Sequence, residues 1–253
     1  MLTAVAFSSI ANARNVMTQD LLWQLGRVSG ETLSPDGMNV IYGISNPNMD
    51  ENRSERNLFS IPLTGGQPKQ ITTTKGTEYN VLKTPDGKMG YLYKGQLWEA
   101  NWDGSDAKQL SQTQQDIDNV KFSPDGKWVM YTHDVKMDLS TQDRYPNLDK
   151  SSGEIIDNLM YRHWDKWEDG SYSHVFVSKV VNGTFTDGDD IMGSDHFDCP
   201  QKPDGGAEDL VWSPDSKYVV YVCKKLSGVN YAVSTNTDLY MWSSVTGNTT
   251  NLT

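Results

Sequence analysis

The chain has few cysteines and no excess of positive charge. Its 253 residues include only Cys199 and Cys223, so no disulfide framework organises the fold, and whether these two pair is left open. The formal net charge of −11 argues against nucleic acid or an anionic membrane surface as a partner, because both need clustered Lys and Arg. No stretch approaches the roughly 20 consecutive apolar residues of a membrane-spanning helix.

Patterns that mark catalytic and metal sites are also missing. No Gly-x-Ser-x-Gly nucleophile elbow occurs anywhere in the chain. The acidic run 187–190 does not fit the spacing of a calcium-binding loop and favours an exposed, solvated loop. The histidines lack the short spacings of zinc ligands; they are His133, His163, His174 and His196. We therefore expect no catalytic residue, no metal and no cofactor in this segment.

The first residues resemble an export signal. Residues 2–10 are mostly apolar and are followed by Ala11-Asn12-Ala13, a small-x-small cleavage pattern. A basic stretch before the apolar run is missing, and a disordered chain end is the alternative. We predict a signal-peptide-like segment over 1–13, a periplasmic or secreted protein, and an N-terminal helix or linker over 14–30 in which Thr18 caps the helix and Gly26 stops it.

A short phrase that recurs four times is the most informative feature present. In this phrase Pro presets the backbone, Asp bonds to the backbone that follows it, and Gly accepts positive φ, so each copy predicts a hairpin turn. Ser216 replaces the glycine in the last copy and must avoid positive φ or tolerate strain. The copies begin at Ser34, Thr84, Ser123 and Ser213.

Each copy precedes an apolar strand, and further strands follow at regular distances. About four strands per unit, at intervals of 50, 39 and 90 residues between copies, are typical of a β-propeller. We predict an all-β fold in which 31–253 forms about four blades of four antiparallel strands, as a partial propeller. A complete four-bladed ring is the less favoured alternative. In a partial propeller, the first and last blades are expected to expose apolar faces.

Long loops interrupt the repeats and are the expected place for function. The doubled third interval contains Arg162-His163-Trp164-Asp165-Lys166-Trp167, which suits either a peptide-contacting loop or a buried crossover with salt bridges. A second insertion spans 184–208. The polar residues 43–56 predict an exposed loop.

Three segments, in this order and at these distances, resemble the N-terminal propeller of the prolyl oligopeptidase family of serine peptidases, especially its secreted bacterial dipeptidyl-peptidase-five and acylaminoacyl-peptidase-like branch. The repeat phrase alone also occurs in other propellers, including the TolB type. The three segments are residues 17–29, residues 161–177 and residues 205–215.

The resemblance implies an exported peptidase in which a propeller gates short peptides and a C-terminal α/β-hydrolase domain carries the catalytic triad. Because the nucleophile elbow is absent, we expect this chain to be an N-terminal segment of a longer serine peptidase and to be inactive alone. Its partners are then peptide substrates and the hydrolase domain. The alternative is a periplasmic TolB-like propeller that acts as a protein-binding scaffold.

An exopeptidase must recognise a free N-terminal ammonium, and a carboxylate at the mouth of the propeller can supply the opposite charge. We predict this role for Glu208; otherwise Glu208 and Asp209 brace the start of the fourth blade. The other predicted substrate-binding residues are Arg162 and Trp164.

Overall fold

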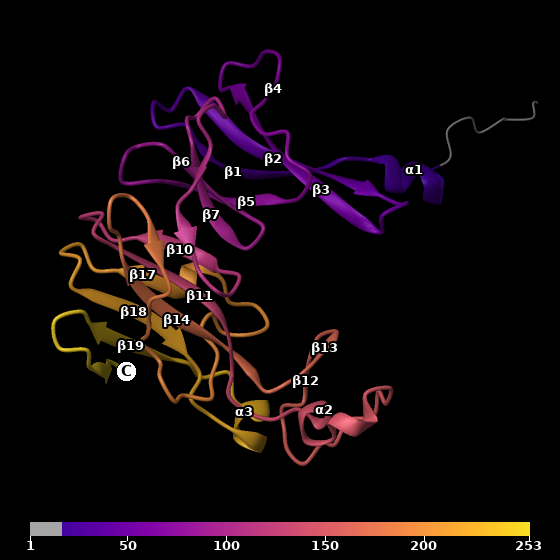
Figure 1. Cartoon of the computed structure of the whole chain (residues 1–253), viewed down its shortest axis with the longest axis vertical. Helices are drawn as coiled ribbons and strands as arrows, with labels where there is room; N and C mark the ends of the chain where they lie inside the picture. The colour runs from indigo at the N-terminus through magenta and orange to yellow at the C-terminus, as the bar shows by residue number, and fades with distance from the viewer. Residues whose placement is uncertain (1–16) are drawn as a thin grey trace, which may run out of the picture.

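The computed structural model describes residues 17–253 and is built from four four-stranded antiparallel sheets (Figure 1). In each sheet the spatial order of the strands follows the chain, so each sheet is a meander and forms one blade. The predicted all-β propeller architecture with four-stranded blades is confirmed. The first blade contains β1 (Arg27–Leu33), β2 (Asn39–Asn48), β3 (Arg53–Pro62) and β4 (Lys69–Gln70); the second contains β5 (Glu78–Lys83), β6 (Met89–Tyr93), β7 (Gln96–Ala100) and β8 (Lys108–Gln109).

The third and fourth blades carry the remaining long strands. The third contains β10 (Asp118–Phe122), β11 (Trp128–Lys136), β14 (Ser171–Lys179) and β16 (Asp189–Asp190); the fourth contains β17 (Leu210–Trp212), β18 (Tyr218–Cys223), β19 (Asp238–Ser243) and β20 (Thr249–Asn251). A short parallel pair, β9 (Ser111–Gln112) with β15 (Phe185–Thr186), connects the segment after the second blade to the third. In Figure 1 the first blade lies at the top and the second lies below it, and the third and fourth blades overlap in the view below the second.

Helices are few and short. They are α1 (Gln19–Gln24), α2 (Thr141–Arg144), α3 (Gly228–Val233) and the 3₁₀ turns η1 (Pro146–Leu148) and η2 (Ala207–Asp209). The α1 helix starts as predicted, since the Thr18 side chain accepts a hydrogen bond from the Leu21 N–H. It ends at Gln24 with an extended cap at Leu25, so Gly26 does not supply the left-handed stop that we expected. No helix within residues 17–253 is long and apolar enough to cross a membrane.

The recurring phrase forms the hairpin turns that the sequence predicts. In the first copy, Ser34 Oγ accepts from Asn39 N at 2.9 Å, and Asp36 Oδ1 accepts from Met38 N at 2.9 Å. The Ser34 hydroxyl also donates to Asp36. The hydrogen bonds from Ser34 and from Met38 N lower the pKa of the Asp36 carboxyl. The third and fourth copies make the same bonds, so the phrase encodes one turn geometry.

Turns of neighbouring blades also contact one another. Ser216 has a φ of 61° and therefore tolerates the left-handed region in place of glycine. Its Oγ accepts a hydrogen bond of 3.1 Å from Asp125 N in the preceding turn. A Cβ built on Gly126 would meet Pro85 Cβ at 2.9 Å, so the second and third turns are packed tightly as well.

The core lies between the blades in three apolar clusters. Leu58 and Met89 are central between the first and second blades, Leu97 and Tyr131 between the second and third, and Val219, among others, between the third and fourth. Each fully buried side chain of this size contributes about 1.5 to 3 kcal/mol of transfer free energy. Stacking of blade on blade is therefore the main source of stability.

The outer faces of the first and fourth blades carry apolar side chains open to solvent, as expected for a partial propeller. In the fourth blade, Val211 is 53% exposed and Leu239 is 39% exposed, and in the first blade Val28 is 67% exposed. In the fourth blade these side chains alternate along β17 and β19 with buried ones, so one face of that sheet is packed and the other is open.

Three expectations for loops and boundaries need correction. Residues 43–56 are not a loop, because β2 and β3 pair without interruption from Asn39↔Pro62 to Asn48↔Arg53 and leave a turn only at 49–52. The first blade begins at Arg27 rather than at 31, because Arg27 already pairs with Ser45. The acidic run 187–190 is not wholly a solvated loop, since β16 joins the third blade there. The signal-like segment 1–13 lies outside the described residues.

Candidate functional site

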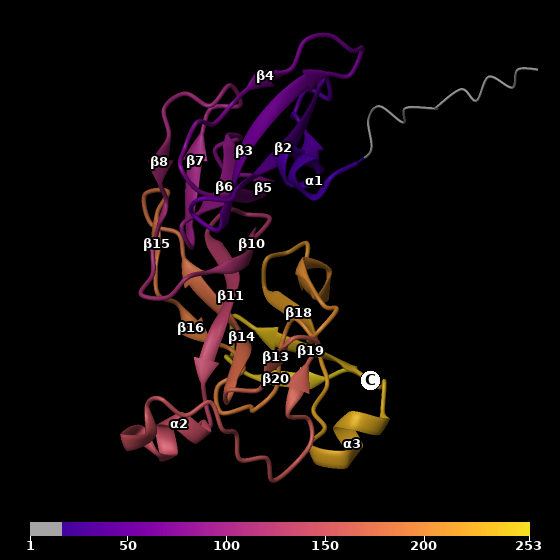
Figure 2. The ribbon, with the colours of Figure 1, turned by 90° about the vertical axis from the view of Figure 1, so that its right-hand side faces the viewer.

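A cavity of about 350 Å³ opens where the insertion in the third blade meets the fourth blade. Its wall comes from parts of the segment 138–170, from Tyr172 at the start of β14, from residues 196–198, and from α3 with the loop before it. Within the insertion lie α2 and a small hairpin of β12 (Arg162–His163) and β13 (Lys166–Trp167). In both ribbon views α2 and α3 lie at the same end of the molecule, and β13 lies just above them (Figure 2).

The lining combines acidic groups with apolar and aromatic surface. Six carboxylates and one guanidinium line the cavity, so its charge is predominantly negative. The acidic residues are Asp138, Glu154, Asp157, Glu168, Asp169 and Asp198. The aromatic lining residues are Tyr161, Trp167, Tyr172, Phe197 and Tyr231. Such a lining suits a ligand with a positive charge next to an apolar group.

Asp138 anchors one side of the cavity. The Tyr172 hydroxyl donates to Asp138 Oδ2 at 3.0 Å, and His196 Nδ1 lies 3.0 Å from the same oxygen. Partial burial alone would raise the pKa of Asp138, but the hydrogen bonds from His196 and Tyr172 outweigh it and lower this pKa. Burial, and then the hydrogen bond to Asp138, raise the pKa of Tyr172. Asp138 is therefore held as a carboxylate and Tyr172 as a neutral donor at neutral pH.

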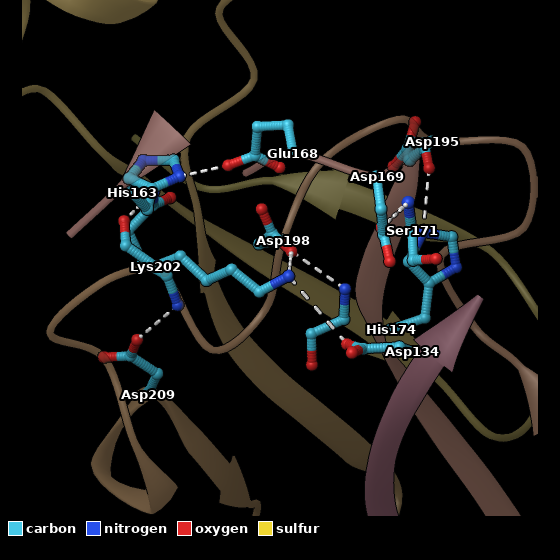
Figure 3. A network of polar contacts seen from close by, with 12 residues as sticks. Asp134, His163, Glu168, Asp169, Ser171, His174, Asp195, Asp198, Lys202 and Asp209 are labelled. Atoms are coloured by element: carbon cyan, nitrogen blue, oxygen red, sulfur yellow. Dashed lines mark hydrogen bonds and ion pairs between the residues drawn. The ribbon is translucent and has the colours of Figure 1, made fainter. Parts of the chain in front are cut away.

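Asp198 is a second acidic anchor in the cavity wall and is almost completely buried (Figure 3). Its Oδ1 accepts from Ser173 N at 2.8 Å and lies 3.0 Å from Lys202 Nζ. Burial alone would lower the pKa of Lys202, but the charge of Asp198 outweighs it and raises this pKa. The ammonium of Lys202 also lies 3.9 Å from Asp134 Oδ1, near the C-terminal end of β11. This ion pair fixes the segment 196–202 against the third blade.

Glu168 and His163 form a further pair in the wall, in which the carboxylate contacts His163 Nδ1. The ring of Tyr231 from α3 packs edge to face on His163, with centroids 5.8 Å apart. The Tyr231 hydroxyl accepts from Gln201 Nε2 at 2.7 Å. The fourth blade thus supports the hairpin from the third.

The predicted residues Arg162 and Trp164 lie together on the β12–β13 hairpin. Arg162 Nε donates to Trp164 O at 3.0 Å, and its guanidinium lies over the Trp167 ring, 5.4 Å from the centroid. Trp164 has a φ of 48° and is 89% exposed. Neither side chain lines the cavity, although their neighbours His163 and Trp167 do. The hairpin is a projecting ribbon and not a buried crossover.

Glu208 lies apart from that hairpin in η2 and is exposed. It is close enough to Lys121 to raise the pKa of that ammonium, whereas burial lowers it more strongly. Lys121 Nζ donates to Leu210 O at 2.7 Å, and Trp212 Nε1 donates to Lys121 O at 3.1 Å. Asp209 Oδ2 accepts from Gln201 N at 2.9 Å, so Asp209 braces the entry to the fourth blade. The structure does not place Glu208 among the residues that line the cavity.

Sequence reasoning missed most of the groups that shape the cavity. Asp138 and Tyr172 flank the insertion, 34 residues apart, and nothing local marks them as partners. Asp198 lies in the second insertion, 184–208, which the sequence marked only as a long loop. Nothing in the sequence marked Tyr231 as functional, because its role depends on how the fourth blade packs against the third.

Comparison with known proteins gives matches over nearly the whole chain. Dipeptidyl-peptidase 5 of Porphyromonas gingivalis is 39% identical over an alignment of 254 residues, which covers 98% of this chain and 37% of that protein. Dipeptidyl-peptidase 5 of Porphyromonas endodontalis is 35% identical and covers 94% of this chain and 35% of that protein. The chain therefore spans about a third of the length of these curated relatives. No family model matches the chain.

Among solved structures, the acylaminoacyl peptidase of Pyrococcus horikoshii superposes with a TM-score of 0.58. The match covers 92% of this chain and 33% of that one at 13% sequence identity, so it supports the fold alone. The resemblance recognised in the sequence is confirmed by the two Porphyromonas relatives.

Proposed function

Because the chain belongs to the dipeptidyl-peptidase 5 branch of the prolyl oligopeptidase family, we propose that it is the substrate-gating propeller segment of an exported serine peptidase that cleaves short peptides. The observation that carries the proposal is the cavity beside the fourth blade, with its carboxylates and aromatic walls. The insertion that distinguishes this chain from a plain repeat builds most of that cavity.

The cavity offers contacts to two groups of a peptide N-terminus, the free ammonium and the first side chain. A free ammonium would lie against the carboxylates of Glu168 and Asp169, which line the cavity beside the hairpin. An apolar first side chain would pack on Trp167 and Tyr231. Blocking the ammonium would remove the charge that these carboxylates face, which lowers affinity.

The three residues singled out in the sequence keep a proposed role in substrate contact. Arg162 and Trp164 project from the hairpin beside the cavity and would contact a peptide as it approaches. Glu208 lies outside the cavity wall, so it and Glu168 are alternative partners for the ammonium, and separate substitutions distinguish them.

The proposed gating role rests on the position of the cavity at the end of the blades. A hydrolase domain that packs against this end would receive only peptides short or extended enough to pass the insertion. The chain has no nucleophile elbow, so we propose that it is inactive without that domain. The TolB-like scaffold has less support, since the two Porphyromonas relatives carry a peptidase name.

The test uses the longer protein that contains this chain and a chromogenic dipeptidyl substrate with a free N-terminus. Glu168→Gln and Glu208→Gln are compared with Asp50→Asn, which lies in the exposed β2–β3 turn. We expect Glu168→Gln to lower kcat/KM about tenfold or more, chiefly through KM, and Asp50→Asn to have no effect.

The outcomes separate the alternatives. If only Glu208→Gln lowers kcat/KM, the ammonium is bound at η2 and not in the cavity. If neither variant alters kcat/KM, or if an N-acetylated substrate is cleaved equally well by all variants, the proposed recognition of the N-terminus is wrong. If the wild-type protein cleaves no short peptide, the peptidase proposal itself is wrong.

A further inference from the structure

Two cysteines lie in one apolar cluster between the third and fourth blades. Cys199 belongs to the segment between β16 and β17, and Cys223 is the last residue of β18. Both are completely buried, and both are free thiols in the structure. They share the cluster with Tyr221 and Leu210.

A hydrogen bond joins the segment that carries Cys199 to the end of β18 that carries Cys223. Lys224, which directly follows Cys223, donates from its backbone N–H to Gln201 Oε1 at 3.1 Å. The segment around Cys199 is therefore bonded to the residue immediately after Cys223. Cys199 N also donates to Ser173 O at 2.8 Å, which fixes its place against the third blade.

We propose that Cys199 and Cys223 form a disulfide when the chain folds in an oxidising compartment. The oxidant is a thiol–disulfide oxidoreductase, or a small disulfide such as oxidised glutathione. One cysteine thiolate attacks a sulfur of the oxidant to give a mixed disulfide, and the second thiolate displaces the reduced oxidant. The two thiol protons leave to solvent or to the oxidant, which gains the two electrons.

The bond forms during folding and not on the finished protein. Burial raises the pKa of Cys223 to about 12 and that of Cys199 well above its usual value, so thiolate is scarce once the blades have packed. The same burial protects the finished disulfide from reductants in solution.

The disulfide would fix one wall of the cavity. His196, Phe197 and Asp198 line the cavity and directly precede Cys199. A covalent link to β18 would tie this wall to the fourth blade in addition to the Asp198–Lys202 ion pair. The inference concerns the bond itself and does not depend on the proposed peptidase function.

The experiment unfolds and reduces the full chain, refolds it in a glutathione redox buffer, and alkylates it under denaturing conditions. We expect no alkyl adducts without reductant, an intact mass about 2 Da below that of the dithiol, and two adducts after reduction. Non-reducing digestion should give one peptide that joins Cys199 to Cys223. Two adducts without reductant overturn the proposal.

Two single-cysteine variants serve as matched controls. Cys199→Ser and Cys223→Ser should each take one adduct regardless of reductant, which shows that the missing adducts in the wild-type chain come from this pair. The oxidised wild-type chain should melt about 6 to 12 °C above its reduced form, since the bond closes a loop of roughly 25 residues. Should either variant fail to fold, the adduct count and the digest of the wild-type chain still decide the question.

Discussion

The Tyr172 hydroxyl donates a hydrogen bond of 3.0 Å to Asp138 Oδ2, joining the two ends of the insertion in the third blade. Met137 N and Asp138 N both donate to Gly170 O at 2.9 Å, so the insertion leaves and re-enters the blade through one closed neck. Everything between these ends, including α2 and the β12–β13 hairpin, projects from that neck.

Removing the Tyr172 hydroxyl tests how much the closed base of the insertion contributes to stability. Tyr172→Phe should lower the free energy of unfolding at pH 7 by about 1 kcal/mol, a modest value because Asp138 is half-exposed. The pKa of Asp138 is lowered in the folded state, so its contribution is present above its unfolded pKa and is lost as pH falls through the folded pKa. Urea unfolding at pH 7 and pH 3 should show the effect shrinking in acid. Tyr145→Phe, at an exposed position, is the control.

The contribution of contacts between the turns to stability can be measured by substituting two glycines. Gly126 and Gly37 have φ of 71° and 68°, so alanine costs similar backbone strain at both positions, about 1 kcal/mol. Only at Gly126 would the new Cβ meet a neighbouring turn, at Pro85, whereas Gly37 faces open space. Gly126→Ala should therefore destabilise the chain by roughly 1 to 2 kcal/mol more than Gly37→Ala. Equal losses in thermal unfolding would show that the turns do not support one another.

A buried acid should make stability depend on pH in the opposite sense. Glu78 is completely buried, its Oε2 has no hydrogen-bond partner within residues 17–253, and burial raises its pKa. A carboxyl with a raised folded pKa favours folding at pH below its unfolded pKa, and this contribution is lost as pH rises through the folded pKa. Glu78→Gln should therefore stabilise the chain at pH 7 and have little effect near pH 4, as measured by urea unfolding. A uniform destabilisation at both pH values would contradict this.

The exposed end faces predict self-association. The double variant Val211→Ser with Leu239→Gln should reduce light scattering at a given concentration and leave the unfolding midpoint nearly unchanged, because both side chains are exposed. Val219→Ser, at a completely buried position on the opposite face of the same blade, should instead cost about 2 to 4 kcal/mol. A wild-type chain that stays monomeric at high concentration would contradict the prediction.

The sequence predicted what is encoded locally. The repeated phrase fixes each turn through bonds between Ser34, Asp36 and the next few residues, so four hairpins and the blade architecture could be recognised. Residues 43–56 were misjudged because polar composition resembles that of a loop, although the strands of a long exposed hairpin are equally polar. The cavity was not predictable in detail, because Asp138, Asp198 and Tyr231 come from three separate segments that only packing brings together.

The most direct test of the central claim is a calorimetric titration of the chain with a short peptide that has an apolar first residue. The same peptide with an acetylated N-terminus is the matched ligand. We predict binding of the free-amino peptide, at least tenfold weaker binding of the acetylated one, and loss of this difference in Glu168→Gln. Equal affinity for the two peptides, or a difference that Glu168→Gln leaves intact, would contradict the assignment of the cavity as the site for a peptide N-terminus.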